Sequence, residues 1–469
     1  MTPSRLHDCH GLAAAPLTRR AALQTASAGF GWLAFSALAQ QAQAASTAAG
    51  LNPLAPKEPH FPARVKRVIF LCMQGGPSHM DTFDYKPQLN ADAGKPGGKG
   101  KLVGSPYPFQ QRGKSGLWIS DVYPNVAQCA DDLCLLRSMT TDIPNHPQAF
   151  TMLHTGSTNF VRPSLGSWVL YGLGKVNENL PGFISISPPL GNAGTFGSAF
   201  LPAIYQGTRI GGLRETEESN AKATLNDLRN PLLTSDLQRH QLDFVQDMNR
   251  DLLSATGGDA EVDGVIQSYE QAFKMQAAVP KVMDISQESK ATQELYGIGS
   301  PASDAFGRQC LMARRFAESG VRFIEVTHGS WDHHSNLKAR LGINGAQTDR
   351  PIAGLITDLK QRGLFHDTLI VWGGEFGRTP DGRSGDGRNH NARGYTMWMS
   401  GGGVKGGYSH GATDEHGHEA VDKPTHVHDL HATILALLGL DHERLTYRYA
   451  GRDFRLTNVS GVVAKDVLA

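Results

Sequence analysis

Short apolar runs alternate with segments of helical spacing along most of this chain. The apolar runs are 65–73, 132–138, 182–187, 321–326, 368–372 and 395–399. The segments with helical periodicity or helix-type ends are 148–154, 164–173, 305–319, 352–361 and 428–438. Strands that alternate with helices are typical of a doubly wound α/β fold, so we predict a mostly parallel sheet flanked by helices.

Two stretches interrupt this alternation. Residues 88–116 are rich in Gly and Lys and predict an exposed insertion. From about 213 to 293, apolar residues recur at helical spacing with few turn signals, which predicts a helical insertion that covers one end of the sheet. We therefore expect one α/β domain over 65–445, preceded by a flexible lead at 45–64 and followed by a tail at 446–469.

The N-terminus has the pattern of an export signal. Residues 18–23 read TRRAAL, an apolar small-residue run follows at 26–38, and AQA at 42–44 offers a cleavage site. Residues 1–44 thus resemble a twin-arginine signal, which implies the twin-arginine translocase as a partner and a periplasmic or extracellular location. The apolar run is short for a membrane span, so no stable span is expected after processing; a retained N-terminal anchor is the alternative.

Charge and cysteine content exclude some classes of function. The chain has 45 basic and 44 acidic residues, which gives no electrostatic reason to expect nucleic acid as a partner. Its five cysteines form neither a disulfide framework nor a CxxC metal motif, although Cys129 and Cys134 are close enough in sequence to pair. We expect most of them to be small buried apolar residues.

The stretch from 367 to 403 is the centre of the predicted site. The apolar run at 368–372 ends in Gly373 and Gly374, and a carboxylate, Glu375, follows at once. A polar loop carrying His390 then leads to the next apolar run. This pattern is typical of a buried parallel strand whose carboxyl end delivers charged groups into a crevice.

Other strand ends release similar side chains. The carboxyl ends of parallel strands face one edge of a sheet, so acids and imidazoles that follow them can converge although they are far apart in sequence. The predicted ligands are Asp81, His146, Asp332, His334, Glu375 and His390. Three carboxylates with three imidazoles suit one or two divalent ions, zinc or manganese in preference to calcium.

Further polar residues near these positions are candidates for substrate contacts. Arg378 and Arg388 would clamp phosphate or sulfate oxygens, or else form salt bridges. Asn145, His79 and His328 are candidate substrate donors.

The motifs resemble the alkaline phosphatase and sulfatase superfamily. Asp81 matches its first metal-binding Asp, DHH at 332–334 its Asp and His ligands, and the segment 145–156 its signature helix ending in Thr-Gly. More narrowly, the strings GGPSHMDTFD, HGSWDHH, GGEFGRTP and SGGGVKGG resemble the twin-arginine-exported family called domain of unknown function 1501. That resemblance implies an alkaline phosphatase-like fold with a metal site, but the family has no established reaction.

The chain departs from the superfamily at two places. His146 stands where the covalent nucleophile would be, and Phe376 stands where a metal-binding imidazole would be. Three explanations stay open: His146 is a metal ligand beside a metal-activated water, His146 is itself the nucleophile, or the site has lost activity. We favour the first, which predicts a hydrolase of phosphate or sulfate esters of small molecules or polysaccharides. The alternative is a catalytically weak envelope or carbohydrate-binding protein.

Overall fold

A nine-stranded sheet forms the centre of the protein in the computed structural model, which describes residues 52–189, 193–211, 232–255, 260–382 and 386–469. The strand order is β14-β5-β13-β9-β1-β8-β6-β7, and β17 pairs with β5 at one edge. The strands are β1 (Arg67–Met73), β5 (Leu133–Thr140), β6 (Phe183–Ile186), β7 (Thr208–Ile210), β8 (Phe323–His328), β9 (Thr368–Gly373), β13 (Tyr395–Gly401), β14 (Tyr408–His410) and β17 (Thr425–His426).

All neighbouring strands in this sheet are parallel except at β13, which runs antiparallel to both β5 and β9. The inner strands β1 and β9 are apolar and buried along nearly their whole length, as expected for strands covered on both faces. The prediction of a mostly parallel α/β sheet is confirmed.

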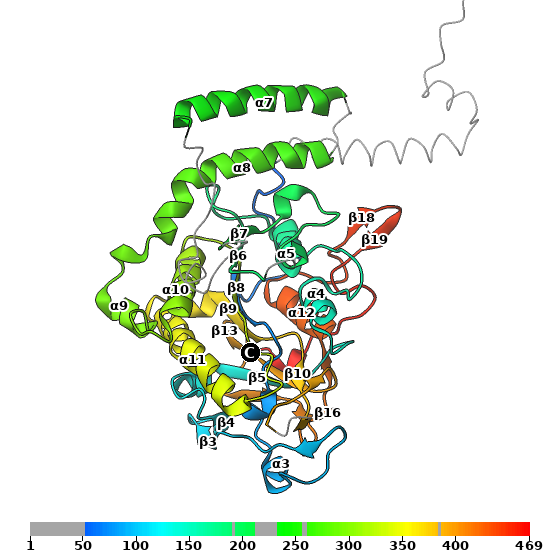
Figure 1. The fold of residues 1–469 in the computed structure, drawn as a ribbon. Helices are drawn as coiled ribbons and strands as arrows, with labels where there is room; N and C mark the ends of the chain where they lie inside the picture. The colour runs from blue at the N-terminus through cyan, green and yellow to red at the C-terminus, as the bar shows by residue number, and fades with distance from the viewer. Residues whose placement is uncertain (1–51, 190–192, 212–231, 256–259, 383–385) are drawn as a thin grey trace, which may run out of the picture. The chain divides into compact units, whose positions relative to one another are not determined.

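Helices cover both faces of the sheet (Figure 1). On one face lie α10 (Asp304–Glu318) and α11 (Leu337–Gln361), and on the other lie α4 (His146–Thr155), α5 (Leu165–Leu173) and α12 (Val427–Leu437). Each face has its own large apolar cluster: Ile69 and Leu71 of β1 belong to one, whereas Val68 and Phe70 belong to the other. This alternation within one strand is the period-2 pattern of a sheet packed on both sides.

One helix differs from its prediction. We expected a helix only at 352–361, but α11 begins at Leu337 and continues through Pro351. A proline inside a helix removes one backbone hydrogen bond and usually ends the helix, which is why the pattern predicts a later start. Leu341, Ile352 and Leu355 are fully buried along the helix, so apolar packing keeps it continuous across the proline.

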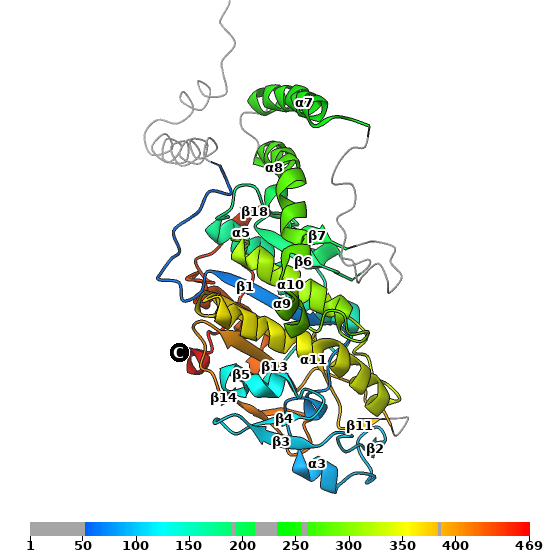
Figure 2. The ribbon, with the colours of Figure 1, turned by 90° about the vertical axis from the view of Figure 1, so that its left-hand side faces the viewer.

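The helical insertion is observed where the structure describes it. Its helices are α7 (Ser235–Ala255), α8 (Ala260–Met283) and α9 (Lys290–Leu295), and α8 packs against α10 (Figure 2). Residues 212–231, which include the start of the predicted insertion, lie outside the described residues. The other predicted insertion, 88–116, holds short elements: the end of α3 (Pro87–Ala91), β2 (Lys101–Leu102) and β3 (Phe109–Arg112), and β3 pairs with β4 (Leu117–Ser120).

Both predicted terminal segments contain residues that pack against the domain, where the structure describes them. In the lead, Leu54 is buried, and the Arg64 N–H donates to the Leu437 carbonyl at 2.8 Å. In the tail, Leu456 and Val467 are buried, because this segment returns to cover the core beside α12. The signal at 1–44 lies outside the described residues, and among those described no helix is both long and apolar enough to cross a membrane.

Candidate metal centre

The segments that follow β1, β5, β8 and β9 meet at one edge of the sheet. Gly75, Asp332 and Glu375 lie in loops after β1, β8 and β9, and His146, after β5, is the first residue of α4. His390 reaches the same edge by another route, because it precedes β13, and an antiparallel strand begins where its parallel neighbours end. The reversed direction of β13 is therefore what brings His390 to the site.

Three imidazoles surround one oxygen of Asp332. From Oδ1 of Asp332, the Nε2 atom of His334 lies at 3.0 Å, that of His390 at 3.2 Å and that of His146 at 3.4 Å. The Nε2 atoms of His334 and His390 are 3.0 Å apart. Four of the six predicted ligands thus lie together.

The far nitrogens of two of these rings have fixed partners. Nδ1 of His146 lies 2.6 Å from Oε1 of Glu375, and Nδ1 of His390 lies 3.0 Å from the Pro144 carbonyl oxygen. Both partners accept hydrogen bonds, so each Nδ1 carries a hydrogen and, in the neutral ring, leaves a lone pair on Nε2. Metal-binding histidines are oriented in this way by carboxylates and carbonyls behind them.

Glu375 was predicted as a metal ligand, but its carboxylate lies behind His146. Its side chain is fully buried, and its two oxygens accept the Gly75 N–H at 3.0 and 3.2 Å besides the bond from His146. Gly75 is required there, because its φ is +114° and an added Cβ would lie 2.7 Å from the Asp332 backbone nitrogen. Glu375 therefore orients His146 from behind.

The separations between these nitrogen and oxygen atoms fit a tetrahedral ion. Ligands at about 2.0–2.1 Å from zinc lie roughly 3.3 Å from one another, which matches the 3.2 and 3.4 Å found from Asp332 to His390 and His146. Two imidazoles with one carboxylate also suit manganese or iron, whereas calcium prefers an all-oxygen set. The residues present therefore fit a transition-metal ion.

The pKa values of His146 and Asp332 are shifted by their neighbours in the cluster. Burial opposes a charge on His146, but Asp332 and Glu375 outweigh it and raise the pKa of this imidazole to about 9. Burial works against ionisation of Asp332, yet hydrogen bonds from His146 and His390 and the charge of Arg378 hold its pKa well below its ordinary value. The cluster thus attracts a positive charge, which a proton or a metal ion can supply.

Arg378 is a structural partner of this cluster. Its guanidinium is buried and donates to the Gly76 carbonyl at 2.9 Å and to Oδ1 of Asp332 at 2.6 Å, besides bonding the Gly75 carbonyl. Of the two roles left open by the sequence, the structure supports the salt bridge. Arg378 holds Asp332 in place.

Asp81 and Arg388 form a separate buried pair. Both side chains are 0% exposed, and Nε and Nη2 of Arg388 donate to the two oxygens of Asp81 at 2.7 and 2.9 Å. Nη1 donates to the Pro380 carbonyl at 3.0 Å. The Arg388 nitrogens are therefore occupied and enclosed in this structure, and the guanidinium lies beside Asp81, where we predicted a metal ion.

The three candidate substrate donors lie in different environments. His79 is buried, and its Nε2 lies 2.8 Å from the Gly417 carbonyl. Nδ1 of His328 accepts the Trp331 indole N–H at 3.1 Å, and burial lowers the pKa of this ring to about 4. Both contacts are structural, whereas Asn145 is exposed directly before His146 and remains available to a substrate.

The sequence did not single out Arg340. This exposed arginine lies on the first turn of α11, and its Nη1 donates to the Asp332 carbonyl at 3.2 Å. Together with Ser330, Asp332, Ile343 and Asn344 it lines an open pocket of about 370 Å³. We predicted that this helix begins at 352, so Arg340 was not assigned to a helix. Because α11 begins at Leu337, Arg340 lies on its first turn, close to the DHH motif.

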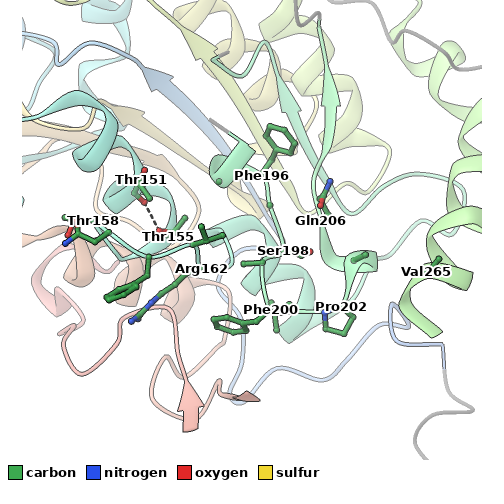
Figure 3. Close-up of a pocket in the computed structure, with 18 residues that line it drawn as sticks. Thr151, Thr155, Thr158, Arg162, Phe196, Ser198, Phe200, Pro202, Gln206 and Val265 are labelled. Atoms are coloured by element: carbon green, nitrogen blue, oxygen red, sulfur yellow. Dashed lines mark hydrogen bonds between the residues drawn. The ribbon is translucent and has the colours of Figure 1, made fainter. Parts of the chain in front are cut away.

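A larger pocket of about 890 Å³ lies along α4 (Figure 3). Thr151, Thr155, Arg162, Phe196 and Phe200 are among its lining residues, and Thr155 donates a hydrogen bond to the Thr151 carbonyl at 2.8 Å. No acid or histidine is among the 18 residues drawn there. This lining can bind a ligand but offers no general base or metal ligand.

Several solved structures are similar to this chain, each at low identity. The phosphonate monoester hydrolase SpPMH from Silicibacter pomeroyi is 12% identical, covers 80% of this chain and 73% of its own, and has a TM-score of 0.31. The PsFucS1 sulfatase from Pseudoalteromonas sp. is 15% identical, with coverages of 81% and 69% and a TM-score of 0.32. A magnesium-bound variant of TAB5 alkaline phosphatase is 12% identical, with coverages of 73% and 92% and a TM-score of 0.32.

At these identities and TM-scores the likeness assigns no activity to the chain. Among curated proteins, none matches it. One family model matches residues 65–468, described as a protein of unknown function, DUF1501. The match spans the whole of the predicted α/β domain and most of the tail and confirms the predicted kinship: the chain belongs to the DUF1501 family.

Proposed function

We propose that this protein is an exported, metal-dependent hydrolase of phosphate or sulfate esters. The observation that carries the proposal is the convergence of the Nε2 atoms of His146 and His390 on Oδ1 of Asp332 at an open edge of the sheet. These three residues are the proposed ligands of one divalent ion, zinc or manganese. When bound, such an ion acts as a Lewis acid that activates a water and polarises an ester oxygen.

The exposure of the cluster supports catalysis over a purely structural metal site. Catalytic zinc sites have three protein ligands and an open position, whereas structural sites are closed. The Asp332 side chain is 43% exposed and that of His334 is 48% exposed, so solvent and substrate can reach them. We assign the open position to the exposed side of Asp332, which lines the pocket beside α11.

His334 is the proposed proton carrier. It was predicted as a ligand, but it is the most exposed of the four clustered residues. Burial, together with the nearby positive charge of Arg378, lowers the pKa of its imidazole, so the ring is neutral near pH 7 and can accept a proton. We propose that its Nε2 holds and returns protons at the ester oxygen, while Arg340 and Asn145 hold the anionic group.

The contacts of His146 support its role as a ligand over the open alternative of a covalent nucleophile. Its Nδ1 is bonded to Glu375, and its Nε2 faces Asp332 and the ring of His390. His146 is not among the residues that line the pocket beside α11, whereas Asp332 and Arg340 are. A nucleophilic imidazole would need a nitrogen free to attack.

The experiment compares chelator-treated protein with zinc-loaded and manganese-loaded protein on nitrophenyl phosphate, bis(nitrophenyl) phosphate and nitrophenyl sulfate. We expect hydrolysis of one ester class by the metal-loaded protein only. Asp332→Ala should abolish turnover and metal binding, and His334→Gln should keep the metal but lower kcat roughly 100-fold, as loss of a general acid–base group does. His366→Ala, at an exposed position at the opposite end of β9, is the matched control.

Folded, metal-loaded protein that hydrolyses none of the three esters would contradict the proposal and favour the alternative of a binding protein. Activity that survives complete metal removal would also contradict it.

Export by the twin-arginine route is part of the same proposal. Replacement of Arg19 and Arg20 by Lys should leave the protein in the cytoplasm.

A further inference from the structure

A second group of metal-binding side chains lies inside the core. Cys72 of β1 and Glu325 of β8 point to the same face of the sheet, and His154 covers them from the last turn of α4. Their residues are 0%, 0% and 3% exposed. The sulfur, nitrogen and carboxylate oxygen lie within 4.8 Å of one another.

The hydrogen bonds of His154 show which atom faces the group. Its Nδ1 lies 2.8 Å from the Phe150 carbonyl, so this nitrogen carries a hydrogen. In the neutral ring, Nε2 then has a lone pair, and it lies 3.2 Å from Oε1 of Glu325 and 4.0 Å from Sγ of Cys72. A lone pair and a carboxylate repel each other at this distance unless a positive charge lies between them.

Glu325 is incompletely satisfied by its neighbours. Oε1 accepts the Thr327 hydroxyl at 3.2 Å, but Oε2 has no hydrogen-bond partner among the described residues. An unpaired carboxylate oxygen in a protein core is costly. Coordination of an ion would satisfy it.

We propose that Cys72, His154 and Glu325 bind a second metal ion at an inner site. This site is distinct from the candidate centre at His146, Asp332 and His390, which we call the outer centre. One thiolate, one imidazole and one carboxylate suit zinc or another borderline-soft divalent ion, whereas magnesium and calcium prefer oxygen ligands. Zinc–sulfur and zinc–nitrogen bonds of about 2.3 and 2.0 Å place these atoms roughly 3.6 Å apart, so the observed 4.0 Å needs only a small closure. The ion displaces the thiol proton of Cys72, which passes to solvent.

The place of this site assigns it a structural role. It joins β1 and β8 to the end of α4, and the first residue of α4 is His146 of the outer centre. An ion enclosed in the core exchanges only when the surrounding structure opens. The inner ion should therefore resist a chelator that strips the exposed outer centre.

Two measurements on the full chain test the inference. Zinc content is measured after dialysis of the folded protein against a chelator and again after denaturation; we expect one ion per chain to remain until unfolding. Protein refolded with cobalt should show a near-ultraviolet sulfur-to-cobalt charge-transfer band. Only the inner site contains a thiolate, so this band reports it independently of the outer centre.

Cys72→Ala should remove both the retained ion and the band, whereas Cys310→Ala, at an equally buried cysteine, should keep both. In Asp332→Ala the band should persist although turnover is lost, which separates failure of the outer site from failure of the inner one. If Cys72→Ala does not fold, the retained ion and the band are compared between Glu325→Gln and the unsubstituted protein. A folded, cobalt-refolded protein without the band overturns the inference and leaves a proton shared by His154 and Glu325.

Discussion

Oε1 of Glu375 lies 2.6 Å from Nδ1 of His146, so a fully buried carboxylate orients a half-buried imidazole whose other nitrogen faces Asp332. This relationship places Glu375 behind the candidate metal centre instead of among its ligands. Two residues after β9, the Gly75 N–H and His146 thus hold the Glu375 carboxylate at the end of the sheet.

Glu375→Gln should weaken metal binding without removing a ligand. The amide can still accept from His146, but it makes the imidazole a poorer ligand, and such substitutions typically cost roughly 10- to 100-fold in affinity. Competition with a chromophoric chelator measures the change. Glu419→Gln, at a half-exposed acid that pairs with Arg393, should leave affinity unchanged. Equal affinities for Glu375→Gln and the unsubstituted protein would argue against the orienting role.

Arg340→Ala should raise KM for the hydrolysed ester more than it lowers kcat. The exposed guanidinium lines the pocket beside Asp332, and a charge-assisted hydrogen bond of about 1.5–3 kcal/mol corresponds to roughly a 10- to 100-fold loss in kcat/KM. Steady-state kinetics provide the test, with Arg350→Ala on the same helix as the control. An unchanged kcat/KM would remove Arg340 from the substrate site.

Breaking the Asp81–Arg388 pair should lower the free energy of unfolding. Asp81→Asn or Arg388→Met leaves one charge enclosed without its partner, which typically costs about 3–5 kcal/mol. The double variant should recover part of this loss, because neither charge is then left alone. Urea denaturation of the four proteins gives the coupling energy. Additive losses would show that the two charges are not coupled. A stable Arg388→Met protein with a raised KM would support the substrate clamp that the sequence suggested.

Acid should destabilise the fold partly through His431. Burial lowers the pKa of this fully buried ring from its ordinary value of 6.5 to about 3, although its Nε2 lies 2.7 Å from the Leu153 carbonyl. Between these values the unfolded chain binds a proton that the folded protein does not, so stability falls as the pH falls from 6.5 towards 3.

His431→Gln keeps a donor for the carbonyl but cannot take up a proton. Relative to the unsubstituted protein, it should lose about 2–3 kcal/mol less stability between neutral pH and about pH 4.5. Urea denaturation at the two pH values measures this difference, with His366→Gln at an exposed position as the control. The same acid sensitivity in both variants would show that His431 contributes nothing.

The fold could be predicted because its strands are buried on both faces and therefore read as continuous apolar runs, as in VIFLCM of β1. The meeting of His146, Asp332 and His390 could be predicted because strand ends share one edge. The pairing of Asp81 with Arg388 could not, since these residues are 307 positions apart and nothing local distinguishes a buried ion pair from a metal ligand. The role of Glu375 follows from the full burial of its side chain at the end of β9, which the pattern of polar and apolar residues does not indicate.

The most direct test is a crystal structure of zinc-loaded protein with anomalous data collected at the zinc edge. We predict a peak about 2.0–2.2 Å from Nε2 of His146, Nε2 of His390 and Oδ1 of Asp332. Well-ordered side chains at these three residues with no zinc peak between them would contradict the metal centre on which the proposed function depends.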